Sequence, residues 1–341
     1  MMNIFLFLFF LYTISLALEV NLKGAITDIA VGKNKLAVST EKGKVFILNK
    51  ESLSVEKEIS LPDFTDFMGE KQKAKVFSVD LSPSEKRVLM VVESDLGKRT
   101  VFLFENGALK PILKLTNVSK GMFLDEDNIV LGTVANEIWL YNIKDKKTVY
   151  KYLVFRFVFS DFDMNKNRSL IAWGDESGKV FFIDPKSGKV IGVGTEGNKD
   201  KIFKLSFAKN RVIVGGRDKK SVIFNLKNKI TNKEEWKEKL DAPSLLKNVK
   251  TQFINRELEF ILFPEKIYES EFMVFVVAMS PNEKYAVFTS DEEGHLTVIA
   301  PGKGIKKVFD VGCFVNVLEF IDDKRLLVGC IDGILKVMEV Q

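Results

Sequence analysis

Histidine and cysteine are scarce in this chain. Among 341 residues there is one histidine, His295, and there are two cysteines, Cys313 and Cys330. Metal cages made of several histidines, zinc sites that combine cysteines with histidines, and catalytic arrangements that use two histidines are therefore excluded. The chain also has no Gly-rich phosphate loop at a strand–helix junction, no GxSxG and no HExxH.

A large charge excess is also missing. Lys and Arg number 51 and Asp and Glu number 46, which gives a net charge of +5 spread along the chain. Nucleic-acid binding proteins usually concentrate basic residues, so no nucleic-acid partner is predicted. Hydrophobic residues make up 46% and charged residues 28%, which excludes wholesale disorder.

One long apolar run is present, IFLFLFFLYTISLAL at positions 4–18. It is shorter than the roughly 20 residues that span a bilayer, and it fits the apolar part of a secretory signal. We predict a signal peptide over 1–17, cleaved after Ala17, with no membrane insertion afterwards. A buried strand or an uncleaved anchor is the alternative, since the first three residues carry no Lys or Arg. No cysteine follows the run, which argues against a lipid anchor.

The rest of the chain is a repeat. An apolar strand, a polar turn, a second apolar strand, an acidic or Gly-containing turn and a third apolar strand recur seven times. The first residues of the third strands lie 56, 37, 42, 42, 74 and 39 residues apart, at Val45, Val101, Ile138, Val180, Val222, Leu296 and Leu335. Most of these spacings match the roughly 40–45 residues of a propeller blade. Seven similar sheets need seven similar neighbours, which a closed ring supplies.

Five of the repeats are followed by a segment that fits a fourth, outer strand: 55–61, 110–115, 148–154, 189–193 and 306–311. The last repeat ends at Gln341 without one, whereas residues 18–24 form a spare strand. We predict an all-β, seven-bladed β-propeller over 18–341, with four-stranded antiparallel blades and a last blade completed by the N-terminal strand. A disordered start is the alternative.

The 74-residue spacing marks an insertion at 228–257. Thr231 and Glu234 fit a capping box, so a short helix ending near Asp241 is predicted. Residues 258–263, LEFILF, are predicted as the delayed outer strand, with 266–270 as a competing register. The insertion is either a surface excursion or a partner-docking element, and in the second case Trp236, Leu240 and Phe253 are the candidate contacts.

Cys313 and Cys330 lie in the last repeat. A hairpin that turns at Asp322 and Asp323 pairs residues whose numbers add up to about 645, which brings Cys313 close to Cys330. A disulfide fits this placement, and two free thiols fit it as well.

Two other groups are interpreted as ordinary turns. His295 follows a Glu-Gly turn at a strand start, so it is predicted to be a solvated turn residue rather than a base. The acidic turns at 125–127 and 291–293 lack the spacing of a calcium loop.

The phrases DLSPSEKRV (80–88) and AMSPNEKYAV (278–287), each followed by an acidic turn and an apolar strand, resemble WD40-like repeats. The resemblance covers nearly all of the chain after the apolar run, although the Trp-Asp dipeptide of that family is absent.

Four stretches are similar to a narrower family, the NapL accessory proteins carried with periplasmic nitrate reductase: 61–81, 131–143, 159–178 and 215–226. The resemblance implies a periplasmic, monomeric, non-catalytic propeller that supports the reductase system by binding a protein partner, a subunit of the periplasmic nitrate reductase. It supplies no catalytic, cofactor or metal residues. The insertion departs from the compact family pattern.

Two other functions remain open from the sequence. One is a generic scaffold for envelope assembly. The other is a propeller enzyme of the quinoprotein dehydrogenase or lactonase type, which needs ligands that converge on the central channel.

Overall fold

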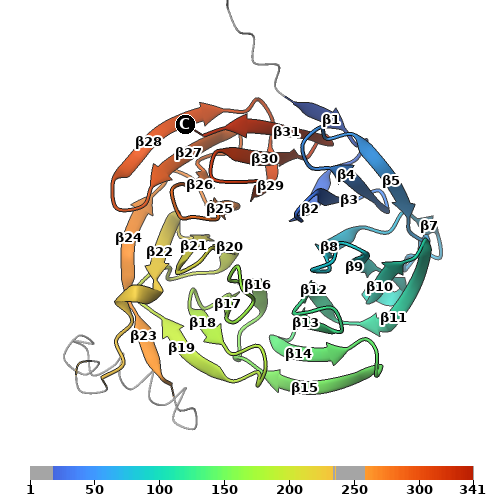
Figure 1. The fold of residues 1–341 in the computed structure, drawn as a ribbon, viewed down its shortest axis with the longest axis horizontal. Helices are drawn as coiled ribbons and strands as arrows, with labels where there is room; N and C mark the ends of the chain where they lie inside the picture. The colour runs from blue at the N-terminus through green and yellow to red at the C-terminus, as the bar shows by residue number, and fades with distance from the viewer. Residues whose placement is uncertain (1–17, 233–234, 236–257, 341) are drawn as a thin grey trace, which may run out of the picture.

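The strands form a closed ring. The computed structural model describes residues 18–232, 235 and 258–340, and in it seven antiparallel sheets surround a central axis (Figure 1). Five of the seven sheets follow the chain without interruption. From the innermost strand outward they are blade 1, β2 (Ile26–Val31), β3 (Lys35–Thr40), β4 (Lys44–Asn49) and β5 (Val55–Ser60); blade 2, β8 (Val76–Leu81), β9 (Arg87–Glu93), β10 (Arg99–Glu105) and β11 (Ala108–Thr116); blade 3, β12 (Val118–Phe123), β13 (Asn128–Thr133), β14 (Glu137–Asn142) and β15 (Lys147–Leu153); blade 4, β16 (Phe159–Met164), β17 (Ile171–Asp175), β18 (Val180–Ile183) and β19 (Val190–Gly194); and blade 6, β25 (Val277–Met279), β26 (Ala286–Thr289), β27 (His295–Ala300) and β28 (Gly304–Asp310).

The two remaining blades take their outer strand from elsewhere in the chain. They are blade 5, with β20 (Ile202–Phe207), β21 (Arg211–Gly216), β22 (Lys220–Asn225) and β24 (Pro264–Glu269), and blade 7, with β29 (Val315–Phe320), β30 (Arg325–Cys330), β31 (Ile334–Glu339) and β1 (Glu19–Asn21). The predicted fold class is therefore confirmed: each blade has four antiparallel strands, and blade 4 carries one strand more.

The hydrophobic core is divided among the blade interfaces. Each pair of neighbouring blades encloses its own buried cluster, for example Val130 and Ile138 of blade 3 against Phe162 and Trp173 of blade 4. Trp173 is fully buried, its ring lies 5.3 Å from that of Phe162, and its Nε1 donates to Asn136 Oδ1 at 2.6 Å. Because the middle strands are buried on both faces, they read as continuous apolar runs, whereas outer strands such as β5 and β15 are largely exposed.

The N-terminal strand closes the ring, as predicted. β1 pairs antiparallel with β31, with Val20 opposite Leu335, and Val337 N donates to Leu18 O at 2.9 Å. The same blade contains a disulfide between Cys313 and Cys330, whose Cα atoms are 6.0 Å apart. Its hairpin has the expected register, with Val315 opposite Cys330. A disulfide that closes a loop of this length contributes about 3 kcal/mol, and this one stabilises the hairpin of the blade on which the N-terminal strand pairs.

The predicted outer strand of blade 5 is wrong. Residues 264–269, which contain most of the competing segment, pair with β22, while β23 (Phe260–Leu262) adds to blade 4 as a fifth strand parallel to β19. The cause is burial: Phe260, Ile261 and Leu262 are all buried, and an exposed outer strand gives such residues no cover. Gly192 makes room for them, because a Cβ there would lie 2.2 Å from the Phe260 ring.

Three predictions lie outside the described residues: the signal peptide at 1–17, the helix in the insertion, and the contacts Trp236, Leu240 and Phe253. Within the described ranges, no helix has the length and apolarity needed to cross a membrane.

The closing joint can be tested at Gly333. It has a φ of +90°, and a Cβ there would lie 2.7 Å from the backbone nitrogen of Gly24, in the connection between β1 and β2. We expect Gly333→Ala to lower the free energy of unfolding by roughly 2–4 kcal/mol, through backbone strain and displacement of the N-terminal strand. Chemical denaturation measures this loss.

The matched control is Gly302→Ala. Gly302 has a similar φ of +80° but open space around it, so this variant should lose only about 1 kcal/mol. Equal losses for the two variants would show that contact across the joint contributes nothing.

Candidate functional site

The ring has two faces that the strand directions define. Inner strands begin at what we call the proximal face, which carries the connections from each outer strand to the next inner strand and from each second strand to the third. They end at the distal face, which carries the other connections. The two faces differ in shape and in chemistry.

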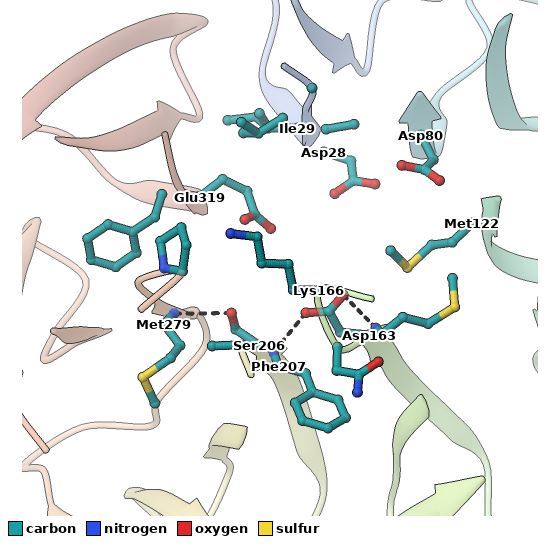
Figure 2. Close-up of a pocket in the computed structure, with 18 of the residues that line it drawn as sticks. Asp28, Ile29, Asp80, Met122, Asp163, Lys166, Ser206, Phe207, Met279 and Glu319 are labelled. Atoms are coloured by element: carbon teal, nitrogen blue, oxygen red, sulfur yellow. Dashed lines mark hydrogen bonds between the residues drawn. The ribbon is translucent and has the colours of Figure 1, made fainter. Parts of the chain in front are cut away.

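A cavity of about 500 Å³ occupies the distal half of the central channel (Figure 2). Its wall comes from all seven blades and is unusually rich in charge. Acidic side chains on it are Asp28, Asp80, Asp163 and Glu319, and basic ones are Lys33, Lys50, Lys120, Lys166, Arg168 and Lys204. Such a mixture in a partly enclosed space raises the question of what each charge contacts.

Many of these polar side chains bond to the neighbouring blade. The inner edge of each innermost strand has no strand beside it, so alternate backbone amides need another acceptor. If six positions are counted from residues 26, 76, 118, 159, 202, 274 and 315, the third residue of blades 1, 2 and 4 accepts from the fourth amide of the next blade. Asp28 Oδ2 accepts from Val79 at 3.0 Å and Asp161 Oδ2 accepts from Leu205 at 3.1 Å.

In blades 2, 4 and 5 the fifth residue accepts in the same way from the sixth amide of the next blade. Asp80 accepts from the amide of Phe123 at 2.7 Å, and Asp163 accepts from that of Phe207 at 2.8 Å. Ser206 accepts from the amide of Met279 at 3.1 Å, and Figure 2 shows the last two bonds. We call these inter-blade hydrogen bonds struts.

Three of the channel charges form a network with Asp161. Lys120 Nζ lies 2.8 Å from Asp161 Oδ1, and Lys204 Nζ lies 3.7 Å from Asp161 Oδ2 and 3.9 Å from Asp28. Burial acts to raise the pKa of Asp161, but the two ammonium groups hold it below its ordinary value. The carboxylates of Asp161, Asp28 and Asp163 in turn raise the pKa of Lys120 against the effect of its burial. Both partners are therefore charged at neutral pH.

Other carboxyl groups of the channel hold their protons more tightly than usual. Burial raises the pKa of Asp80 to about 6. Removal from water, with the nearby charge of Asp163, raises the pKa of Glu319 to about 8. The cavity therefore takes up protons on acidification within the neutral range.

The turn residues that the sequence singled out are bound within their own turns. His295 Nδ1 lies 2.6 Å from Asp291 Oδ2 in the turn between β26 and β27. Asp125 Oδ1 accepts from the backbone amides of Asp127 and Asn128. In the described part of the chain, no three His, Cys, Asp or Glu side chains come together in a way that could hold a metal ion.

Among the described connections between strands, apolar exposure differs between the two faces. Where strands are connected, the described large hydrophobic residues that are exposed all belong to the proximal face: Phe67, Met68, Leu96, Val134, Phe157, Val158 and Ile331. Others are on outer strands, such as Val308 of β28. On the same face, at the start of the inner strands of blades 5 and 6, the rings of Phe203 and Phe275 contact each other, with their centroids 4.9 Å apart. The proximal face therefore has the composition of a protein-binding surface.

Sequence reasoning identified neither the channel charges nor this asymmetry. A signal for the first existed in the inner strands, where a charged or hydroxyl residue recurs at the third or fifth position, as in TDIAV (27–31) and SDFDM (160–164). Exposure at the proximal face had no such signal, since apolar residues also fill the core.

Comparisons with known proteins agree on the architecture. The scan of family models finds no match, and neither does the search of curated proteins. Among solved structures, the chain is similar to the β-propeller domain of Cps50 (Swd1) from Myceliophteria thermophila, with 14% identity and a TM-score of 0.68, over 95% of this chain and all of that domain. The chain is a seven-bladed, WD40-like β-propeller.

The Asp161 network gives a test of the struts. Asp161→Ala leaves the Lys120 ammonium without its closest carboxylate and the Leu205 amide without its acceptor. We expect a loss of about 3–5 kcal/mol in the free energy of unfolding, as for other broken buried ion pairs. The control is Asp145→Ala, which removes an exposed pair with Lys147 and should cost less than about 1 kcal/mol. A loss for Asp161→Ala as small as the control would contradict a stabilising network.

Glu319 gives a test of the proton uptake. Since its pKa is raised to about 8 in the folded protein from 4.5, the folded state binds a proton that the unfolded state has released between those pH values. Stability therefore falls as pH rises through this window and levels off above about 8.

In the Glu319→Gln variant the group stays neutral, so this fall should shrink, and at pH 9 the variant should be more stable than the wild type by at least about 1 kcal/mol. Urea denaturation from pH 5 to pH 9 measures it, with the exposed Glu292→Gln as control. Parallel pH profiles for wild type and Glu319→Gln would refute the assignment.

Proposed function

We propose that this protein is an exported, non-catalytic scaffold that binds a protein partner through its proximal face. The observation that carries the proposal is that, among the connections the structure describes, exposed large apolar residues occur on that face and not on the other. A partner that covers exposed apolar side chains removes them from water, and this favours binding. Loops held on a stiff scaffold are well suited to such a role.

The disulfide supports the exported location. Cys313 and Cys330 account for both cysteines of the chain, and they are joined. Disulfides of this kind form and persist in oxidising compartments such as the periplasm and are rare in the cytosol. This agrees with the signal peptide that the sequence predicts over residues 1–17.

The partner that we propose is a component of a periplasmic nitrate reductase system. Support for it comes from the similarity of residues 61–81, 131–143, 159–178 and 215–226 to the NapL accessory family. Within this proposal the chain acts as a monomer without a cofactor, and it supports the reductase by contact rather than by chemistry. Part of the first of these stretches lies in the proximal connection between β5 and β8.

The test is recovery of the partner. Tagged mature protein, isolated from nitrate-grown cells after mild crosslinking, should enrich a reductase component. The variant Phe157→Glu/Val158→Glu, at proximal residues that are 39% and 44% exposed, should recover at least about tenfold less, because charged side chains weaken an apolar contact. Quantitative mass spectrometry of the recovered proteins gives the ratio.

The matched control is Ile305→Glu/Val308→Glu on the outer strand β28, where the two side chains are 64% and 53% exposed. It should recover as much as the wild type. Recovery of envelope-assembly proteins without any reductase component would contradict the nitrate reductase assignment. Equal recovery by both variants would contradict the proximal face as the binding surface.

A further inference from the structure

The most exposed apolar side chains of the protein lie on a small hairpin. Two short strands, β6 (Phe64–Thr65) and β7 (Lys71–Gln72), pair within the proximal connection between β5 and β8. At the tip, Phe67 is 80% and Met68 is 86% exposed, the two highest values among the exposed large hydrophobic residues described. Their side chains contribute little to the stability of the propeller, because apolar groups stabilise a fold when they are buried.

The tip has a fixed shape. Asp66 Oδ1 accepts from the backbone amides of Met68 and Glu70, both at 2.9 Å, and Asp66 Oδ2 accepts from Gln72 Nε2 at 3.2 Å. These bonds, with contributions from several tip amides, hold the pKa of Asp66 below its ordinary value. Gly69, with a φ of +82°, completes the turn. Phe67 and Met68 are therefore presented by a preorganised turn.

The hairpin is also attached to its blade. Thr65 N donates to Asp95 Oδ1 at 2.7 Å, and Lys73 Nζ bonds to Asp63 at 2.8 Å. The Phe67 ring lies over Gly97, where a Cβ would approach it to 3.2 Å. Leu96, next to Gly97, is 69% exposed. Phe67, Met68 and Leu96 together form what we call the tip patch.

We propose that the tip patch inserts into an apolar pocket on the surface of the protein partner and is the main anchor of the proximal face. This inference rests on the proposed scaffold function and identifies its contact. A rigid, projecting apolar group loses little conformational entropy on binding, and that is how a few residues come to supply most of the affinity of an interface.

Charge favours a protein pocket over a membrane surface. Between residues 61 and 75, three acidic side chains (Asp63, Asp66, Glu70) balance three basic ones (Lys71, Lys73, Lys75). Adhesion to anionic lipid relies on clusters of about 4–8 basic residues. A connection whose charges balance, with an apolar tip, instead fits an uncharged apolar pocket with a polar rim.

The experiment places a photo-crosslinking amino acid, p-benzoylphenylalanine, at position 67 of the purified mature protein, which is then irradiated in periplasmic extract. Position 115 on the outer strand β11, where Leu115 is 52% exposed, is the negative control, and position 157 is the proximal comparison. We expect one crosslinked protein from position 67 and none from position 115.

That protein, once purified, is titrated with wild type and with Phe67→Ser/Met68→Ser. We expect the variant to bind at least about tenfold more weakly, with Leu115→Ser binding as the wild type does. Thermal denaturation should give the same midpoint for all three proteins, because these side chains are exposed. Unchanged affinity of the tip variant would overturn the inference.

The remaining outcomes separate the two proposals. Crosslinks from position 157 but not from position 67 would overturn the tip patch and leave the scaffold function standing. No crosslink from either position would overturn both. A crosslink to a second copy of this chain, or cosedimentation of the wild type with phosphatidylglycerol-rich vesicles that Phe67→Ser/Met68→Ser abolishes, would show that the tip patch has a different occupant.

Discussion

The structure depends on the backbone hydrogen bonds at the inner edges of its blades. Each innermost strand pairs on one side only, and an amide left without an acceptor near the axis would cost stability. Asp28, Asp80, Asp161, Asp163 and Ser206 solve this by accepting from the following blade. Part of the polarity of the channel is therefore explained by the backbone of the ring itself.

The inner edges of the blades and the apolar interfaces between the blades therefore stabilise the ring in different ways. Apolar packing between blades supplies the bulk of the stability, as the clusters around Trp173 and Phe162 show. The struts constrain the placement of blades 1 and 2, 2 and 3, 4 and 5, and 5 and 6 relative to each other, because an oxygen accepts a hydrogen bond only from a narrow range of positions.

Most of the fold could be predicted from the sequence, because the period and the alternation are local properties. Seven blades, most outer strands and the pairing of Glu19–Asn21 with β31 follow from them. The strand at 260–262 could not be assigned, because its partner β19 lies in another blade and the pairing depends on the space left by Gly192. The same holds for the site. The struts join residues some 40–70 positions apart, and the tip patch is recognised only by its exposure.

The path of the chain around the insertion has a consequence for its evolution. Ile230 and Ile261 exchange backbone hydrogen bonds, each 3.0 Å long, so the excursion leaves and rejoins the propeller at one point. Chain length between fixed ends costs little, since the closure entropy grows only with the logarithm of loop length. Segments of very different size could be exchanged at this site without disturbing blades 4 and 5, which makes it a natural place for the lineage to gain or lose a module.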